Sequence, residues 1–212
     1  MATFFGRGAY ATLFKIWTVT GGLTMAESNA TDLRVQKTQD AIQTAIKEMI
    51  CEMDAADITI KELTERAHIH RKTFYLHYTC IEALFEDLLG QITEEYYHAI
   101  DQLPIDAPFT EVNRVFFEFT ARQEPYAERL LCAPGYREFA DKLFLNTMIH
   151  NRTRHNPYAA FSREEQNIIN TFLCVTSVNI YRQWVADKKR VPLERLIALS
   201  GTLLNNGVVS LF

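Results

Sequence analysis

The sequence predicts an all-helical protein, on three observations. The chain of 212 residues contains only eight glycines and six prolines, a composition that favours long helices over a turn-rich β fold. Apolar residues recur at spacings of three and four, the period of one helix face. No segment alternates apolar and polar residues over the length of a strand. With 48% hydrophobic residues, the chain can bury one sizeable core or two small ones.

Charge and cysteine usage narrow the class of protein. The formal net charge is −4, so any contact with nucleic acid must come from a local basic patch. The four cysteines are widely separated and form no C-x-x-C pair, which argues against a zinc finger or a disulfide scaffold. We expect reduced thiols and no metal or cofactor in a cytoplasmic protein, with a redox-sensing thiol as the alternative. The cysteines are Cys51, Cys80, Cys132 and Cys174.

The first 24 residues differ from the rest of the chain. Lys15 interrupts their apolar run, whereas a signal peptide needs an unbroken apolar core. No run of about 18 apolar residues occurs anywhere, so no transmembrane helix is predicted. Met25 and the residues after it look like a natural protein start. We expect residues 1–32 to form a flexible extension, the alternative being an arm that touches membrane or DNA.

A first helix is predicted over residues 33–51. Its apolar positions follow the spacing of one helix face, and a polar break at residues 54–57 follows it. These apolar positions are Ile42, Ala45, Ile46, Met49, Ile50 and, just beyond the helix, Met53.

A short second helix is predicted to begin at Thr59. Thr59 and Glu62 have the spacing of a capping box, in which each side chain satisfies a free backbone N–H group at the helix start. Leu63 and Ala67 are expected to face the core. After a tight turn, a third short helix covers residues 70–77.

A long fourth helix is predicted to follow. Thr79 and Glu82 repeat the capping-box spacing at its start, and Pro104 stops it after about residue 102. One face of this helix is apolar from Leu84 to Ile100. The helix would join the N-terminal helices to the remainder of the chain.

The second half of the chain is also helical by pattern. After a linker at residues 101–108, helices are predicted over residues 109–122, 125–132 and 136–155. Ser162 begins a third capping box, which opens a long helix. The last helix follows Pro192, a residue that suits the first helical position.

Residues 59–84 contain the most informative motif, T-I-K-E-L-T-E-R-A-H-I-H-R-K-T-F-Y-L-H-Y-T-C-I-E-A-L. Two short helices, a tight turn and a further helix start are typical of a helix-turn-helix, whose second helix lies in a DNA major groove. Residues 59–80 have four basic and two acidic side chains, a net charge of +2. Residues 33–58 have three basic and five acidic side chains, a net charge of −2. Positive charge thus lies where a recognition helix would meet phosphates, although charge alone also fits a solvated helix face.

Side chains around the turn have the chemistry of DNA contacts. Arg71 or Lys72 could donate to the O6 and N7 acceptors of guanine, a contact worth roughly 1–3 kcal/mol of discrimination. Lys61 could reach a phosphate or a base edge, and Phe74 is expected to face inward. Donors suited to phosphate oxygens are Thr73, Tyr75 and His77.

The run R-K-T-F-Y-L-H-Y at residues 71–78, followed by E-A-L at residues 82–84, resembles the signature of the tetracycline-repressor (TetR) family. This resemblance covers about residues 33–88. The run N-I-Y-R-Q-W at residues 179–184 is similar to one TetR branch that includes a dihydroxyacetone-kinase operon activator. The resemblance implies an all-α homodimeric regulator, by default a repressor, that binds a near-palindromic operator. It implies a DNA-binding domain at residues 33–88 and a ligand-binding and dimerisation domain at residues 89–212.

The resemblance also assigns DNA contacts by position. Residues that fall where family members touch bases or the nearby backbone are Lys61, Arg71, Lys72 and Tyr75. Residues that fall where members touch phosphates are Thr59, Thr73 and His77.

Three positions depart from the family pattern. The turn usually has glycine where His68 stands, and histidine tolerates a left-handed backbone at some cost. Helix three is usually capped by serine or asparagine where His70 stands, so its start should be less well fixed. Helix four usually begins with a phosphate-binding lysine where Ile81 stands. The absence of this lysine should weaken DNA binding. It should also reduce the slope of log K against log salt concentration by roughly one unit.

The second half of the chain is rich in aromatic residues, which would suit a pocket for an apolar or aromatic small molecule. For any single residue, an ordinary core position is the simpler explanation. A ligand that displaced the long fourth helix could tilt the recognition helix, and this mechanism is implied by family analogy. The predicted ligand-binding residues are Tyr96, His98, Phe116, Phe119, Tyr136, Phe172 and Trp184.

Dimerisation is expected through the last two helices, which would pair with their twins as a four-helix bundle. A symmetric dimer presents two recognition helices roughly 34 Å apart, or a multiple of that distance. The sequence predicts no enzyme, since no Ser/His/Asp set, phosphate loop or dinucleotide motif is visible.

Two other functions stay open. The pairs Glu65/His68 and Glu95/His98 match the Glu-x-x-His pattern of di-iron helix bundles, although so short a motif arises by chance. A protein-interaction or sensor module without DNA affinity is the other alternative, and His68 and Ile81 favour it.

Overall fold

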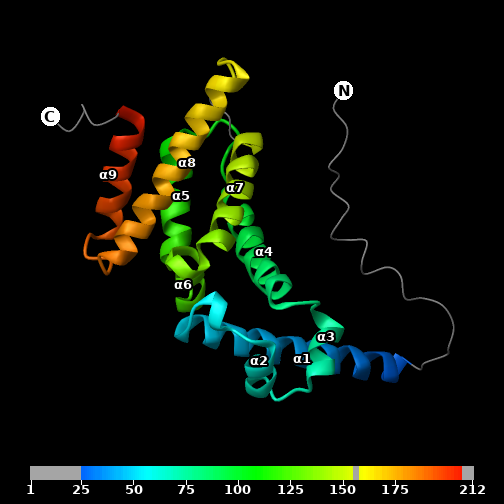
Figure 1. Cartoon of the computed structure of the whole chain (residues 1–212). Coiled ribbons are helices and arrows are strands. Elements are labelled where there is room, and N and C mark those ends of the chain that lie inside the picture. The colour runs from blue at the N-terminus through cyan, green and yellow to red at the C-terminus, as the bar shows by residue number, and fades with distance from the viewer. Residues whose placement is uncertain (1–24, 155–157, 207–212) are drawn as a thin grey trace. The chain divides into compact units, whose positions relative to one another are not determined.

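The computed structural model describes residues 25–154 and 158–206, and its regular elements over these residues are all helices (Figure 1). The predicted all-helical class is confirmed, whereas residues 1–24 of the predicted extension lie outside the described residues. None of the described helices combines the length and the apolar character needed to cross a membrane. In chain order the elements are α1 (Met25–Glu52), η1 (Ala55–Asp57), α2 (Ile60–Arg66), α3 (Arg71–His77), α4 (Ile81–Ile100), α5 (Phe109–Ala121), α6 (Pro125–Cys132), η2 (Pro134–Tyr136), α7 (Arg137–Arg154), α8 (Arg163–Ala186) and α9 (Leu193–Asn206).

The described residues divide into two units, with the boundary between residues 39 and 40. In the first unit, α1 begins at Met25, so the predicted extension overlaps this helix over residues 25–32. Within the same unit, Thr38 Oγ1 donates a hydrogen bond to the carbonyl oxygen of Arg34 at 2.9 Å. The remainder of α1 and all later elements belong to the second unit.

In the second unit, the end of α1 forms a small core with α2 and α3. Leu63 and Ala67 of the second helix are buried there, as predicted. Burial of this apolar face holds α2 and α3 in place, because helices of two turns are not stable alone. The side chains with no solvent exposure in this core are Ile42, Ile46, Met49, Ile50, Leu63 and Phe74.

The predicted capping box at α2 is half formed. Thr59 Oγ1 accepts a hydrogen bond from the backbone N–H of Glu62 at 3.2 Å. The Glu62 carboxylate, however, pairs with Arg66 Nη2 at 2.8 Å instead of turning back to the helix start. The turn after α2 contains His68 at φ 54°, which is the left-handed conformation predicted there.

The predicted capping box at α4 is wrong. The N-cap residue is Cys80, and its side chain makes no capping hydrogen bond. Because α4 begins one residue later than the box requires, Glu82 is the second helical residue and not the third. Thr79 Oγ1 instead donates to Cys80 Sγ at 3.8 Å.

Helix α4 runs from α3 to the second half of the chain (Figure 1). Its predicted apolar face is buried along its whole length, from Leu84 to Ile100. One hydrophobic core is therefore continuous across α4. The predicted domain boundary at residues 88/89 falls inside this helix and stays a prediction.

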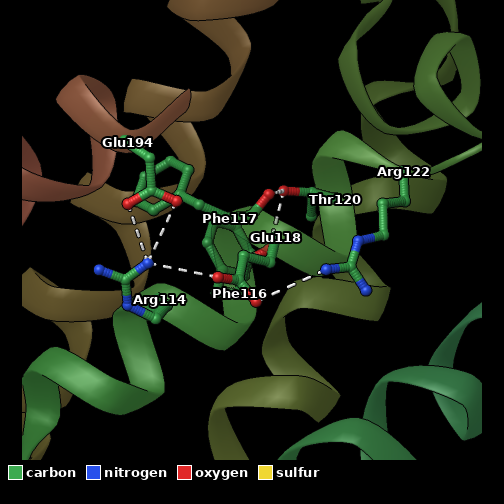
Figure 2. Close-up of polar contacts among 7 residues, drawn as sticks. All are labelled: Arg114, Phe116, Phe117, Glu118, Thr120, Arg122 and Glu194. Atoms are coloured by element: carbon green, nitrogen blue, oxygen red, sulfur yellow. Dashed lines mark hydrogen bonds and ion pairs between the residues drawn. The ribbon is translucent and has the colours of Figure 1, made fainter. Parts of the chain in front are cut away.

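In the second half of the chain, α5 is tied to α9. Asn113 Nδ2 donates to Ser200 Oγ at 2.9 Å in the buried interface. Figure 2 shows a row of ion pairs that begins at Glu194 of α9 and continues through Arg114 to Glu118 on α5. Buried apolar side chains of α9, among them Leu196, complete this contact. Helix α8 begins with the complete capping box that was predicted at Ser162.

A second connection links the residues after α1 to α6 and η2. Tyr136 Oη donates to the carbonyl oxygen of Met53 at 2.8 Å, and Arg129 Nη2 pairs with Asp54 at 3.2 Å. Gly135 allows this approach, because a Cβ there would lie 2.5 Å from Asp54 Cγ. The helix-turn-helix segment is thus held both through α4 and through this latch, defined as Met53, Asp54, Arg129, Gly135 and Tyr136.

Candidate nucleic-acid interface and ligand pocket

Helix α3 has one buried face and one exposed face. Phe74 is fully buried, as predicted, and fixes the orientation of the helix against the core. Successive helical residues are turned by about 100°, so Lys72 and Leu76 lie on the side roughly opposite Phe74. Both are exposed. Thr73 and His77 are half-buried on the flank of the helix.

Arg71 and Tyr75 of α3 form one unit on the exposed side. The guanidinium of Arg71 donates to Tyr75 Oη from Nη2 at 3.0 Å and from Nε at 3.3 Å. Its central carbon lies 5.6 Å from the Tyr75 ring centroid, within the range of a cation–π contact. Arg71 is therefore held over the ring, whereas Lys72 makes no ion pair with any described residue and projects freely.

The two cations of α2 differ in whether they are free to bind a phosphate. Arg66 pairs with Glu52 at 2.7 Å and with Glu62 at 2.8 Å, so its charge is balanced. Lys61 is exposed and has no carboxylate partner among the described residues. Thr59 is exposed as well, and its hydroxyl can still donate while its oxygen caps α2.

The positions that depart from the family pattern have visible consequences. His70, the N-cap residue of α3, makes no side-chain capping bond, as predicted from its identity. Ile81 is buried in the hydrophobic core, so the first residue of α4 presents no charge to solvent. Burial lowers the pKa of His77 below its usual value of 6.5, which favours the neutral imidazole.

The sequence prediction omitted Leu76, whose side chain is 83% exposed. Its spacing of two residues from an inward-facing Phe74 would have placed it on the outer face. Charged and hydrogen-bonding side chains are the usual signal of a DNA contact, and an apolar side chain gives no such signal.

A second candidate site is a partly open pocket among α4, α5, α7 and α8. Its wall is largely apolar and draws on four helices that are far apart in sequence. Of the seven predicted ligand-binding residues, Tyr96 and Phe116 line it. Apolar lining residues include Val112, Phe116, Phe144, Met148, Leu173 and Val178.

The other five predicted residues lie elsewhere. His98 is exposed near the end of α4, and Phe172 is 52% exposed on α8. Phe119 packs edge-on against Tyr96, with ring centroids 5.4 Å apart, outside the lining. Trp184 is buried and its Nε1 donates to the Val191 carbonyl at 2.7 Å.

Tyr136, the fifth of these residues, belongs to the latch. Its hydroxyl donates to Met53, and its ring packs edge-on against Phe85 with centroids 5.7 Å apart. Burial raises the pKa of Tyr136 to about 12. Aromatic content alone could not separate such core positions from lining positions, because both need apolar side chains.

The polar groups at the pocket are partly satisfied by hydrogen bonds. Asn151 Nδ2 donates to Tyr96 Oη at 2.9 Å, and burial raises the pKa of Tyr96 well above its usual range. The side-chain oxygens of Asn113 and Asn151 accept no hydrogen bond from the described residues. Burial raises the pKa of the Cys174 thiol to about 11, so it stays protonated at neutral pH.

The metal-binding alternative gains no geometric support from its two motifs. Glu65 and His68 are exposed at the end of α2 and in the turn, and Glu95 and His98 are exposed on α4. A di-iron bundle needs such residues to project into a shared core. Here all four side chains face solvent.

No protein-family model matches the chain. Over 75 residues, 35% of the chain, it is 37% identical to a Bacillus subtilis (strain 168) protein described as the uncharacterized HTH-type transcriptional regulator YxbF. The matched segment spans 19% of the length of that relative.

Solved structures share the fold over most of the chain. A TetR transcriptional regulator from Streptococcus agalactiae 2603V matches 84% of this chain and 98% of its own, with a TM-score of 0.64 at 19% identity. The regulator FadR from Bacillus subtilis, solved in complex with stearoyl-CoA, matches 80% of this chain and 99% of its own, with a TM-score of 0.55 at 18% identity. The finer resemblance to the activator branch stays a prediction, because likeness at such identities shows the fold alone. The chain has the all-helical fold of TetR transcriptional regulators, as the motif at residues 71–84 predicted.

Proposed function

We propose that this protein is a DNA-binding transcriptional regulator of the TetR type and not an enzyme. The observation that supports it best is the exposed surface of α3, where Lys72 lies opposite a fully buried Phe74 and Arg71 is exposed on the flank. A helix held in this way can lie in a major groove with its cations toward bases and phosphates. In its finer form, the proposal is a cytoplasmic, ligand-responsive repressor that binds a near-palindromic operator as a homodimer.

The proposed DNA contacts differ in the part of the DNA that each side chain would touch. Lys72 projects freely and would read guanine acceptors, whereas Arg71 and Tyr75 act as one unit at a base edge or the adjacent backbone. Lys61 would bind a phosphate or a base edge from α2. Contacts to phosphate oxygens would come from Thr59, Thr73 and His77.

A homodimer through the last two helices has support from α8. Ile168, Phe172 and Val175 are exposed by 70%, 52% and 51%, and their spacing places them on one helix face. A stripe of this kind can pack against its own copy about a two-fold axis. Helix α9, whose apolar side chains are buried on α5, would contribute at the edge of the bundle.

The proposed effector is a small molecule with an apolar or aromatic body. The apolar lining supports this class. The amide oxygens of Asn113 and Asn151, which accept no hydrogen bond within the described part of the chain, favour a ligand that also donates hydrogen bonds. The structural relative solved with stearoyl-CoA makes a long acyl chain a reasonable first probe. Helix α4 would transmit the signal, because it lines the pocket at Tyr96 and begins directly after α3.

The experiment that tests the proposal measures binding to the chain's own upstream intergenic DNA by fluorescence anisotropy. We expect wild-type protein to prefer that fragment over random DNA at about 150 mM salt. The Arg71→Ala, Lys72→Ala variant should lose this preference, whereas a control with the same charge change, Lys142→Ala, Arg190→Ala, should keep it. A folded double variant that binds as tightly as wild type would refute the proposal.

One alternative has specific support, namely a sensor module on the same fold without DNA affinity. The missing cap at His70 and the buried Ile81 both weaken the expected phosphate contacts. The same measurement separates the two functions. Absence of salt-resistant, fragment-specific binding by wild type would favour the sensor module.

A further inference from the structure

Leu76 has a degree of exposure that folding does not explain. At 83%, it is the most exposed of the large apolar side chains that the structure describes. Exposing a leucine forgoes the burial that stabilises a fold. Its position is also tightly defined, since the fully buried Phe74 two residues earlier orients the whole of α3.

Leu76 shares its helix face with a cation. Lys72 precedes it by one helical turn on that face, and Arg71 is exposed elsewhere on the same short helix, over the Tyr75 ring. Neither Lys72 nor Lys61 has a carboxylate partner among the described residues. The face around Leu76 is thus basic, which suits a polyanion.

A protein partner fits this face poorly. On α3, the exposed apolar groups are Leu76 and the 46% exposed Tyr75, which is far less than a stable protein interface buries. One leucine among cations instead has the composition of a major-groove contact. In that groove, thymine presents a 5-methyl group, the apolar feature that distinguishes it from the other bases.

We propose that Leu76 is a specificity-determining residue that reads thymine through its 5-methyl group. The inference rests on the proposed DNA-binding function and deepens it. Lys72 would bind an acceptor-rich base one turn away, while Leu76 covers a thymine methyl group in the same half-site. Leu76 would contribute discrimination, whereas the cations contribute most of the affinity.

The test uses duplexes selected from a random DNA pool by the full-length wild-type protein. Each thymine of the selected site is replaced in turn by deoxyuridine, which lacks only the 5-methyl group, and affinity is measured by fluorescence anisotropy. Replacement of the contacted thymine in one half-site should weaken wild-type binding by about three- to fivefold, as expected from the burial of one methyl group. Replacement in both half-sites should weaken it by roughly tenfold or more, since two subunits bind.

The Leu76→Ala variant should bind thymine and deoxyuridine duplexes equally at that position. A control in another exposed apolar residue, Ile105→Ala (67% exposed in the wild type), should keep the wild-type discrimination. Circular dichroism should show both variants folded, because neither side chain packs in the core.

The outcomes separate this inference from the function on which it rests. If no duplex is enriched by wild type, both the DNA-binding function and the inference fail. If duplexes are enriched but every deoxyuridine replacement is neutral, the inference alone is overturned. The same holds if the discrimination persists unchanged in Leu76→Ala.

Discussion

The exposed face of α3 and the pocket among α4, α5, α7 and α8 differ in how their side chains meet solvent. On α3, cations and one leucine are left in solvent, and a single buried phenylalanine behind them keeps the helix in place. In the pocket, polar groups are withdrawn from solvent, and Tyr96 and Asn151 are paired with each other. The exposed side chains of α3 therefore contribute little to the stability of the fold, whereas the pocket is lined by residues that also form the core. Substitutions should therefore separate binding from stability on α3 and combine them at the pocket.

The largest expected effect contrasts the two faces of α3. Phe74→Ala should lower the free energy of unfolding by about 3–5 kcal/mol, because it empties a fully buried site. Leu76→Ala should change it by less than about 0.5 kcal/mol, since the side chain is exposed. Urea denaturation followed by circular dichroism measures both. Equal losses in the two variants would show that α3 is not oriented as described.

At the pocket, Tyr96→Phe removes one buried hydroxyl without changing the ring. The Asn151 amide then loses its acceptor, so the free energy of unfolding should fall by about 1–3 kcal/mol. Binding of an acyl-chain or anilinonaphthalene probe should change as well, while affinity for DNA in the absence of ligand stays as in wild type. His98→Ala, at a predicted residue outside the lining, serves as the control and should alter neither quantity.

The latch contacts α4 at Phe85 and can be used to test whether the two regions communicate. Tyr136→Phe removes the hydrogen bond to Met53 and should cost about 1 kcal/mol of stability. If the latch transmits the signal together with α4, a pocket probe that weakens DNA binding in wild type should weaken it less in this variant. An unchanged response, measured by anisotropy at saturating probe, would assign the coupling to α4 alone.

The smallest expected effect is a pH dependence from His77. Burial lowers its pKa in the folded state, so the unfolded chain binds a proton more readily as pH falls below about 6.5. Stability should therefore be fully present at neutral pH and decline on acidification toward the lowered pKa. Urea midpoints between pH 5.5 and 7.5 (roughly one unit on either side of the unfolded pKa) should show this decline in wild type. In His77→Gln the decline should be smaller, and an identical slope in the two proteins would contradict the assignment.

Local patterns predicted much of the first half of the chain. The burial of Leu63 and Phe74 follows from residue type and short spacing, whereas the expectations for the left-handed backbone at His68 and the uncapped start of α3 came from the resemblance to the TetR family. Two capping boxes out of three were less well predicted. The one at Thr59 is half formed because Arg66 takes the Glu62 carboxylate, and the one at Thr79 fails because α4 begins after Cys80.

Such local patterns did not predict which aromatic residues line the pocket. Phe116 and Phe119 have the same chemistry and lie three residues apart, yet only Phe116 lines the pocket. Phe172 was predicted to bind ligand, but α8 turns it to the exposed stripe. Periodicity says that a residue is on an apolar face, and it does not say which neighbour that face meets.

The amino-acid sequence by itself determined the helical class, the helix-turn-helix and the charge on its second helix, because these depend on contacts within a few residues. Tertiary packing decided which aromatic side chains enclose a pocket, which cations stay unpaired and where Gly135 lets the chain close on Asp54. Those features join segments far apart along the chain. Their geometry is set by the shape that several helices make together, which no single segment encodes.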